Sequence, residues 1–219
     1  MPKRINIILR NEQPKDYRTV EELTREAFWN HHVPGCNEHY LLHTMRNAAS
    51  FIKELDVVAE VDGRIVGNIV YTKATIIDDD NRVHEVLCFG PLSVLPEFQH
   101  RGIGRTLIES TKITAKELGY KAILIYGDPD YYCKFGFIAA ETFKIGTADN
   151  MYAPPLQALE LVPGALSNLE GRFFEDAVYN VNEIAANEFD RGFVPKEQRD
   201  DLPSQMRFRH LISMRKPRK

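Results

Sequence analysis

The sequence is poor in the features that mark secreted, membrane-spanning or nucleic-acid-binding proteins. Its three cysteines are too few and too scattered for a disulfide framework, so we expect free thiols in the cytoplasm. No stretch reaches the roughly 18 apolar residues that a membrane span needs. Lys and Arg total 28 against 31 Asp and Glu, and the net charge of -3 predicts no general attraction to nucleic acid or to anionic membranes.

Repeats, low-complexity segments and a secretion signal are also missing. Residues 1–10 hold only a short apolar run and no small-residue cleavage site, so we expect a first strand near residues 5–9. What the chain has is 43% hydrophobic and 27% charged residues, the composition of a protein that buries a real core. Its 219 residues fit one domain with a sizeable appendage.

The order of predicted elements indicates a mixed α/β sheet in one domain. Two helical patterns come first, and Pro34 and Gly35 separate them. Asp62 and Gly63 then join two apolar runs, which is a strong signal for a hairpin with a two-residue turn. A further strand at about residues 83–94, a helix and the apolar run "KAILIY" follow, and we expect that run at the centre of the sheet.

The pattern weakens after about residue 140. The runs "LQALEL" and "GRFFE" are candidate strands, and "VNEIAANEF" has the spacing of an amphipathic helix. The stretch from Lys196 is polar and interrupted by prolines, and we expect its basic end, "MRFRHLISMRKPRK", to be a short solvated tail and not a nucleic-acid contact.

A glycine-containing turn lies where the strand "GPLSVLP" gives way to a helix. Gly102 and Gly104 let the backbone bend tightly and approach a ligand, and the helix that begins there points unpaired N–H groups at the turn. Arg101 and Arg105 add positive charge, and Thr106 adds a hydroxyl. These features suit a pyrophosphate cradle. A short G-x-G alone is more typical of an ordinary strand-to-helix turn, so the interpretation depends on the sequence around it.

The sequence around this turn resembles the GNAT superfamily of acyl-CoA-dependent N-acyltransferases, and among them bacterial YhbS-like predicted acetyltransferases. Gln99, Gly102 and Gly104 fit the family motif Gln/Arg-x-x-Gly-x-Gly/Ala. The downstream run "YCKFGF", from Tyr132 to Phe137, fits a second motif that ends in Tyr-x-Lys-x-Gly-Phe. The resemblance covers about residues 5–161 and says little about the acceptor.

The resemblance implies a GNAT-like single domain whose mostly antiparallel sheet is splayed between the fourth and fifth strands, with helices on both faces. It implies a core at residues 1–161 and a C-terminal extension at residues 162–219 that packs on the core or on a partner subunit. The cofactor would be acetyl-CoA. The residues that would bind it are Leu92, Ser93, Val94, Gln99, His100, Arg101, Gly102, Ile103, Gly104, Arg105 and Thr106.

The resemblance also implies a direct transfer of the acetyl group to a primary amine of a small molecule or peptide. Tyr132 would be the general acid at the CoA sulfur, with Tyr131 as its substitute, and the Val94 N–H would stabilise the oxyanion. The general base is not evident from the sequence. Glu85 on the fourth strand is one candidate and Asp128 after the fifth strand is another, although each is also typical of a solvated carboxylate.

The segment "HHVPGCNEHYLLH" concentrates histidines, and His39 and His43 share a helical face. Three interpretations remain open: a polar helix face, a wall of the acceptor site formed by Cys36, His39 and His43, and a zinc site. The spacing lacks the tight pairs of most zinc sites, so we expect no metal. Two rival functions also remain, a non-catalytic acyl-CoA-binding domain and a metal-dependent hydrolase. A homodimer is a further expectation.

Overall fold

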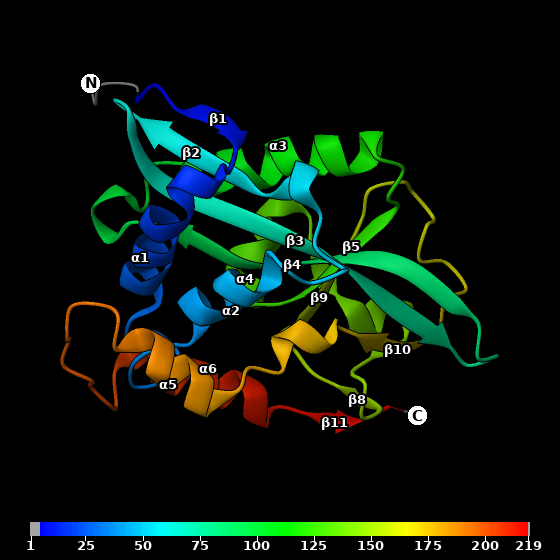
Figure 1. Cartoon of the computed structure of the whole chain (residues 1–219). Helices are drawn as coiled ribbons and strands as arrows, with labels where there is room; N and C mark the ends of the chain where they lie inside the picture. The colour runs from blue at the N-terminus through cyan, green and yellow to red at the C-terminus, as the bar shows by residue number, and fades with distance from the viewer. Residues whose placement is uncertain (1–4, 219) are drawn as a thin grey trace.

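The structure is a computed structural model that describes residues 5–218, and a twisted sheet crosses its whole width (Figure 1). The strands are β1 (Ile8–Asn11), β2 (Val57–Val61), β3 (Arg64–Asp78), β4 (Val83–Val94), β5 (Ala122–Tyr126), β6 (Ile138–Ala139), β7 (Ile145–Gly146), β8 (Met151–Tyr152), β9 (Leu156–Glu160), β10 (Gly171–Phe174) and β11 (Lys216–Pro217). The helices are α1 (Tyr17–Phe28), α2 (Glu38–Met45), α3 (Ile103–Glu117), α4 (Pro129–Tyr132), α5 (Glu183–Asp190) and α6 (Pro203–Ser213).

The sheet order is β1-β2-β3-β4-β5-β9-β6, and β10 pairs with the C-terminal half of β3. Neighbours along this path are antiparallel except β4 and β5, which are parallel and meet at the single pair Leu87–Ile123. Beyond that pair the two strands have no further register, so the sheet opens there. The mostly antiparallel sheet that splays between its fourth and fifth strands was predicted and is confirmed.

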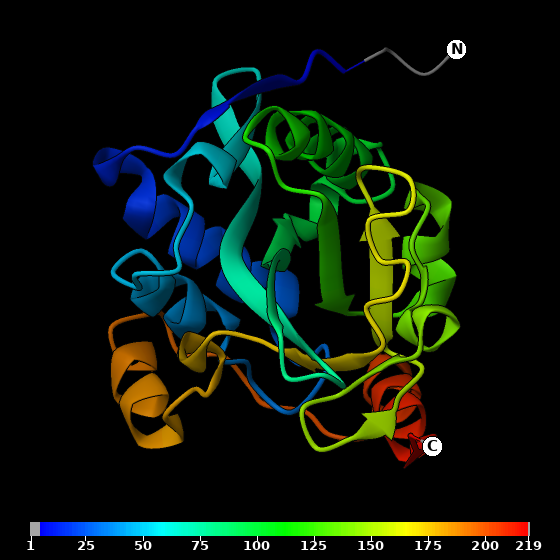
Figure 2. The ribbon, with the colours of Figure 1, turned by 90° about the vertical axis from the view of Figure 1, so that its right-hand side faces the viewer.

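Helices cover both faces of the sheet (Figure 2). On one face the Tyr71 hydroxyl of β3 lies 2.8 Å from the Thr111 hydroxyl of α3. On the other face the Ser93 hydroxyl of β4 donates to the Thr24 hydroxyl of α1 at 2.9 Å. Because side chains alternate along a strand, these two contacts define an α3 face and an α1 face for β3 and β4.

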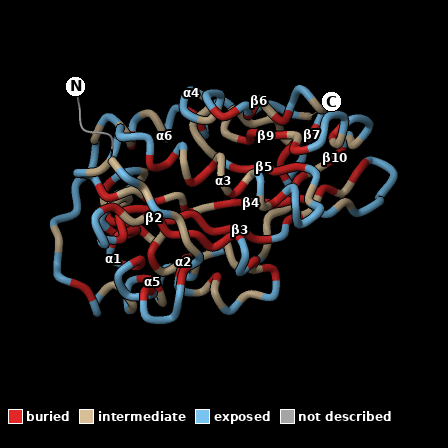
Figure 3. The backbone as a smooth tube through the Cα atoms, turned by 90° about the horizontal axis from the view of Figure 1, so that it is seen from above, coloured by how far each residue is buried: buried red, intermediate tan, exposed pale blue. Residues whose placement is uncertain are grey.

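The core lies along the central strands, which are the most deeply buried part of the backbone (Figure 3). One apolar cluster joins α1, β2, β3 and α3, and a smaller one surrounds β5, β9 and β10. Residues 122–125 of β5 are fully buried, and β5 lies between β4 and β9. The expectation that "KAILIY" is central is therefore correct, because a run without a polar face must be covered on both sides.

The segment after residue 161 packs against several other parts of the chain. Its strand β10 completes one edge of β3, α5 packs beside α2, and β11 pairs with β8. Arg25 of α1 holds α5 through Asp190, with Nε 2.6 Å from Oδ1. A domain boundary at residue 161 stays a prediction.

The expectation of a short solvated tail is wrong, because residues 203–213 form helix α6 and the basic side chains are paired. Arg207 contacts both carboxylate oxygens of Asp128 at 3.0 Å, and Arg218 donates to Asp79. Leu211 and Gln205 are buried. The prolines misled the prediction: Pro203 occupies the first turn of α6, where its missing N–H costs no hydrogen bond.

Candidate functional site

The glycine turn stands at the start of α3, with Gly102 as the N-cap residue. Gly102 has φ of +87°, a left-handed conformation that strains any residue with a Cβ. A Cβ built there would meet no atom within 4 Å, so the space above this turn is open. The strand-to-helix reversal therefore requires a glycine and leaves room beside its backbone.

The first amides of α3 face this open space. Thr106 is the first residue to donate within the helix, to the Gly102 carbonyl at 2.9 Å. The N–H groups of residues 103–105 have no acceptor among the residues the structure describes. Arg101 and Arg105 are exposed, and in the described chain neither forms an ion pair. Two arginines and the positive end of a 15-residue helix thus surround one spot.

The remaining predicted members of the turn lie close by. His100 is exposed with φ of +60°, so the turn contains two left-handed residues within three positions. Ile103 is buried and anchors the helix start in the core. The Thr106 hydroxyl donates to the Gly102 carbonyl at 3.0 Å, and the Gln99 amide donates to the Val94 carbonyl at 3.1 Å. The structure therefore brings the end of β4 and the start of α3 together.

The edge of β4 that faces the opening carries backbone N–H groups that do not pair with β3. Leu95 donates its N–H to Val66 of β3, so the N–H groups of Val94 and Leu92 point away from β3, by the alternation of an antiparallel pair. A register shift opposite Ile69–Tyr71 places an extra residue in β4 at Gly90–Pro91, whose peptide bond is cis. This bulge interrupts pairing in the middle of the opening.

Tyr132 lies on the α3 face, beside this opening. Its ring packs against Phe89, Phe137 and Phe135 at centroid distances of 5.8, 5.7 and 6.4 Å. A Cβ on Gly127 would lie 2.1 Å from Cε2 of Tyr132, so Gly127 leaves the room that the ring fills. Burial raises the pKa of the Tyr132 hydroxyl, which keeps its proton at neutral pH.

Tyr131 points instead at the start of α3. Its hydroxyl would lie 2.8 Å from a Cβ on Gly104, next to the side chains of Val94 and Leu92. Gly104 therefore has a packing reason to be small in addition to any contact with a ligand. Burial raises the pKa of Tyr131, and Arg105 partly offsets that shift.

The two candidate bases have partners of their own. Glu85 is exposed at the far end of β4 from the turn and pairs with Lys73 at 3.0 Å. Asp128 caps α4 and binds Arg207, which holds the pKa of Asp128 below its usual value. As the ion pair of Asp128 shows, the C-terminal helix α6 reaches the segment that carries Tyr132.

The histidine segment is covered by α5. Cys36 and His39 are buried, with the Cys36 sulfur 3.6 Å from Nδ1 of His39, and the rings of Phe189 and Phe193 pack on His39. Burial raises the pKa of Cys36 and lowers that of His39. An acceptor could touch these two side chains only if α5 moved, whereas His43 is exposed and contacts Glu21. The acceptor-wall interpretation stays a prediction.

Within residues 5–218, no group of three or more His, Cys, Asp or Glu side chains is arranged to hold a metal ion. Nor does any helix within these residues have the length and apolar character to cross a membrane.

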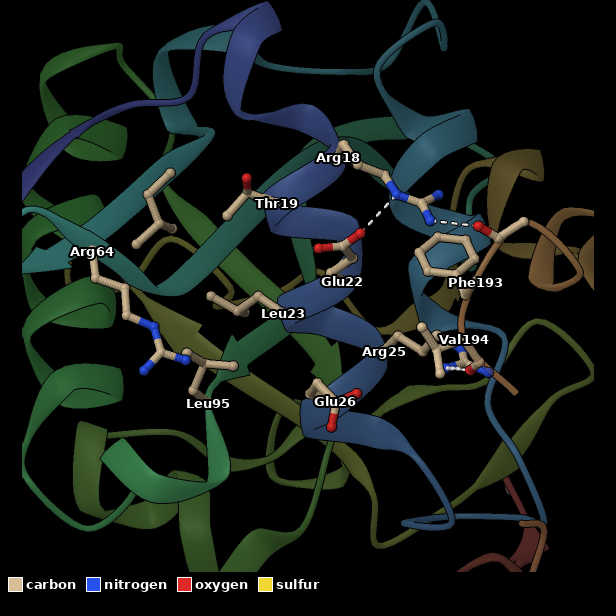
Figure 4. A pocket seen from close by; sticks show the side chains of 12 residues that line it. Arg18, Thr19, Glu22, Leu23, Arg25, Glu26, Arg64, Leu95, Phe193 and Val194 are labelled. Carbon is tan, nitrogen blue, oxygen red and sulfur yellow. Dashed lines mark hydrogen bonds and ion pairs between the residues drawn. The ribbon is translucent and has the colours of Figure 1, made fainter. Parts of the chain in front are cut away.

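A separate groove lies over α1, between Arg64 and Leu95 on one side and residues 192–194 on the other (Figure 4). On the side of residues 192–194, Arg18 donates to the Gly192 carbonyl at 2.6 Å, and Arg25 donates to the Val194 carbonyl at 3.0 Å. Leu95, just beyond β4, lines its opposite wall. These bonds attach the C-terminal extension to α1, so one side of the groove is a contact between these two parts of the chain.

Sequence reasoning missed a group of side chains on the α1 face of the opening, formed by Cys88, Tyr126, Glu175 and Tyr179. Cys88 lies on β4 and Tyr126 on β5, whereas Glu175 and Tyr179 come from the segment after β10. Oε1 of Glu175 is 3.7 Å from the Cys88 sulfur, and the Tyr179 hydroxyl is 3.4 Å from the Gly90 carbonyl. No sequence motif marks the segment that carries Glu175 and Tyr179, and the run "GRFFE" predicted only a strand there.

The GNAT acetyltransferase domain pattern matches residues 52–139. The chain is 32% identical over 84 residues to the uncharacterized N-acetyltransferase YjhQ of Escherichia coli, a match that covers 38% of this chain and 45% of YjhQ. It is 25% identical over 131 residues to the uncharacterized N-acetyltransferase YhbS of the same organism, which covers 60% of this chain and 73% of YhbS.

Two solved structures share the fold. The crystal structure of E. coli YhbS in complex with CoA superposes with a TM-score of 0.71 at 22% identity, over 83% of this chain and 96% of YhbS. A GNAT acetyltransferase of Brucella melitensis in complex with acetyl-CoA superposes with a TM-score of 0.64 at 25% identity, over 80% of this chain and 98% of that one. Residues 52–139 therefore match the acetyltransferase domain of the GNAT family, and the chain has the fold of these two GNAT structures.

Proposed function

We propose that the protein is an N-acetyltransferase that transfers the acetyl group of acetyl-CoA to a primary amine of a small molecule or peptide. The observation that carries this proposal is the start of α3, which adjoins the open edge of β4. Among residues 5–218, its first three amides have no acceptor and Arg101 and Arg105 form no ion pair. The N-acetyltransferases and the CoA and acetyl-CoA complexes among the similar proteins support it.

The residues of the turn suit the diphosphate of acetyl-CoA. The amides of residues 103–105 would donate to its oxygens, and Arg101 and Arg105 would neutralise its charge. The outward N–H groups of Leu92 and Val94, together with Ser93 between them, give the pantetheine arm a strand edge to pair with. When bound, acetyl-CoA supplies an acyl group that is activated as a thioester.

Val94 and Tyr132 have roles that follow from their positions. The Val94 N–H points into the opening and can donate to the oxygen of a carbonyl under attack, where it stabilises the developing negative charge. Tyr132 keeps its proton, because burial raises its pKa, and can donate it to the departing sulfur. Holding both reactants between β4 and β5 supplies a further part of the rate enhancement.

Two finer assignments belong to the proposal. Glu85 stays a predicted base, although its exposed pairing with Lys73 gives it little support. The dispersed cysteines, all free thiols, support a cytoplasmic location. A homodimer also stays a prediction.

The experiment measures thiol release from acetyl-CoA with a panel of primary amines, alongside CoA binding by calorimetry. We expect transfer to at least one amine, and a loss of 10²-fold or more in kcat in the variant Tyr132→Phe with CoA affinity unchanged. Binding of CoA without transfer to any amine, and with Tyr132→Phe indistinguishable, would show a non-catalytic acyl-CoA-binding domain instead.

A further inference from the structure

Glu175 lies beside the opening between β4 and β5, where the proposed reaction still lacks a well-supported general base. It is the first residue after β10, and β10 runs antiparallel to residues 75–78 of β3. The backbone then crosses beneath the point where β5 ends (Figure 2). Its carboxylate thereby reaches Cys88 of β4, within one residue of the pair Leu87–Ile123 at which β4 and β5 part.

Glu175 and Tyr132 lie on opposite faces of that opening. Tyr71 faces α3 and pairs across the strands with Phe89, which contacts the Tyr132 ring. The next residue of β3, Thr72, faces the other way. It pairs with Cys88, and its hydroxyl lies 3.5 Å from that of Tyr179. A carbonyl held between β4 and β5 would thus have Tyr132 on one side and Glu175 on the other.

The carboxylate of Glu175 has no cation to neutralise it. Within residues 5–218 it forms no ion pair, whereas the neighbouring carboxylate Asp176 is occupied as the cap of a 3₁₀ turn, where it accepts the Val178 N–H at 2.9 Å. Burial raises the pKa of Glu175 to about 7. A partly buried, unpaired carboxylate costs stability, which is typical of a group retained for chemistry.

We propose that Glu175 is the general base that takes the proton from the attacking amine. This inference rests on the proposed acetyltransferase function and adds to it a residue from the C-terminal extension. Tyr179, from the same segment as Glu175, donates its hydroxyl to the Gly90 carbonyl of the β4 bulge, on the same face of the opening. The extension would then complete the acceptor side of the site.

Each proton that moves in the proposed acetyl transfer has a donor and an acceptor. As the bond from the amine nitrogen to the acyl carbon forms, Glu175 accepts the proton that the nitrogen loses. As the carbon–sulfur bond breaks, Tyr132 gives its proton to the sulfur. Glu175 then releases its proton to solvent, and Tyr132 regains one from solvent, so that one amide and one thiol replace one amine and one thioester.

The groups around Glu175 do not titrate near its pKa. Burial raises the pKa values of the Cys88 thiol and of the Tyr126 and Tyr179 hydroxyls, so all three stay neutral at pH 6–8. Beyond Tyr126, Asp149 has a lowered pKa because of its bonds to Thr147 and Arg215, and it stays ionised. An acidic limb near pH 7 in the rate profile is therefore the expected signature of Glu175.

The test compares the wild-type protein with three variants, Glu175→Gln, Glu85→Gln and Glu170→Gln. Glu170 lies at the start of the same segment and pairs with Lys144 at the surface, so its variant is the matched control. For each protein, CoA binding is measured by calorimetry, and thiol release from acetyl-CoA is measured from pH 5.5 to 9.5 with the amine that the wild type uses best.

We expect Glu175→Gln to bind CoA as the wild type does, to lose about 10²-fold or more of kcat/KM at pH 7, and to lack the acidic limb. The control should match the wild type. An unchanged rate and limb in Glu175→Gln, or the same loss in Glu85→Gln alone, would overturn the inference and leave the acetyltransferase standing. A wild type that binds CoA but acetylates no amine would overturn both.

Discussion

At the scale of single residues, the site depends on two glycines that leave room for two adjacent tyrosines. Gly104 admits the hydroxyl of Tyr131, and Gly127 admits the ring of Tyr132. The tyrosines approach from α4, whereas the two glycines belong to α3 and to the end of β5. Gly104, which belongs to the first family motif, therefore has a role in packing between elements, and Gly127 has a similar role outside the two motifs.

The variant Gly127→Ala tests the contact with Tyr132. The added Cβ must displace the ring, since it would lie 2.1 Å from Cε2, and overpacking of this kind costs about 1–3 kcal/mol of unfolding free energy. We expect a lower melting temperature together with a reduced rate of acetyl transfer. Thermal denaturation and thiol release measure the two effects.

The control for this variant is the same substitution in a Tyr132→Ala background. With the ring removed, the alanine at position 127 has space, so the stability cost should fall to near zero. An equal cost in both backgrounds would show that the loss comes from elsewhere, for instance from the backbone at the end of β5.

At the scale of elements, buried charges connect β1, β2, α1 and α2. The carboxylate of Glu12 is fully buried and accepts two hydrogen bonds from Arg46, the residue that follows α2, at 2.7 and 2.9 Å. Arg46 also binds Glu21 of α1 at 2.6 Å. Asp56, which leads into β2, lies beside Glu12, and burial and that neighbour raise its pKa.

The raised pKa of Asp56 predicts how stability depends on pH. The folded protein keeps Asp56 protonated at pH values where the unfolded chain has released the proton, so the unfolding free energy falls as pH rises from about 4 toward neutrality and beyond. In Asp56→Asn the side chain cannot ionise, and this decline should be smaller. Urea unfolding at pH 5 and pH 8 measures it, and equal declines in both proteins would contradict the assignment.

The attachment of α6 is a second property at this scale. Arg207 holds Asp128 at the start of α4, whereas Arg209 pairs with Asp200 and Asp201 just before its own helix. Exposed ion pairs contribute only about 0–1 kcal/mol, so neither Arg207→Ala nor Arg209→Ala should change the melting temperature much. Hydrogen exchange should nevertheless accelerate in α4 and α6 for Arg207→Ala alone. Equal exchange in the two variants would disprove the coupling.

The elements that the sequence predicted are those that local chemistry determines. Periodicity predicted α1, α3 and the hairpin at Asp62–Gly63 because local chemistry determines each of them. It did not predict that α2 buries His39, since that side chain is covered by α5, which lies about 150 residues away along the chain. It also missed Glu175, because strand pairing and burial place that residue beside β4, and no sequence motif marks it.

At the scale of the whole molecule, the candidate site is assembled from the entire chain. The turn of α3 and the edge of β4 come from the GNAT domain, Tyr132 comes from α4, and Glu175 follows β10 in the extension. The extension also binds α1 through Arg25 and α4 through Arg207. If Glu175 is the general base, the part of the chain beyond the matched family domain forms the acceptor side of the site.

The proposed binding of CoA by the α3 turn is tested most directly by calorimetry on Gly102→Glu, with Gly119→Glu as the control. Gly119 follows the C-terminal end of the same helix, has nearly the same φ of +90° and is equally open. A carboxylate at position 102 would repel the diphosphate and strain the turn, so we expect the Kd for CoA to rise by more than about tenfold, while Gly119→Glu binds as the wild type does. A folded Gly102→Glu with the affinity of the wild type would contradict the account.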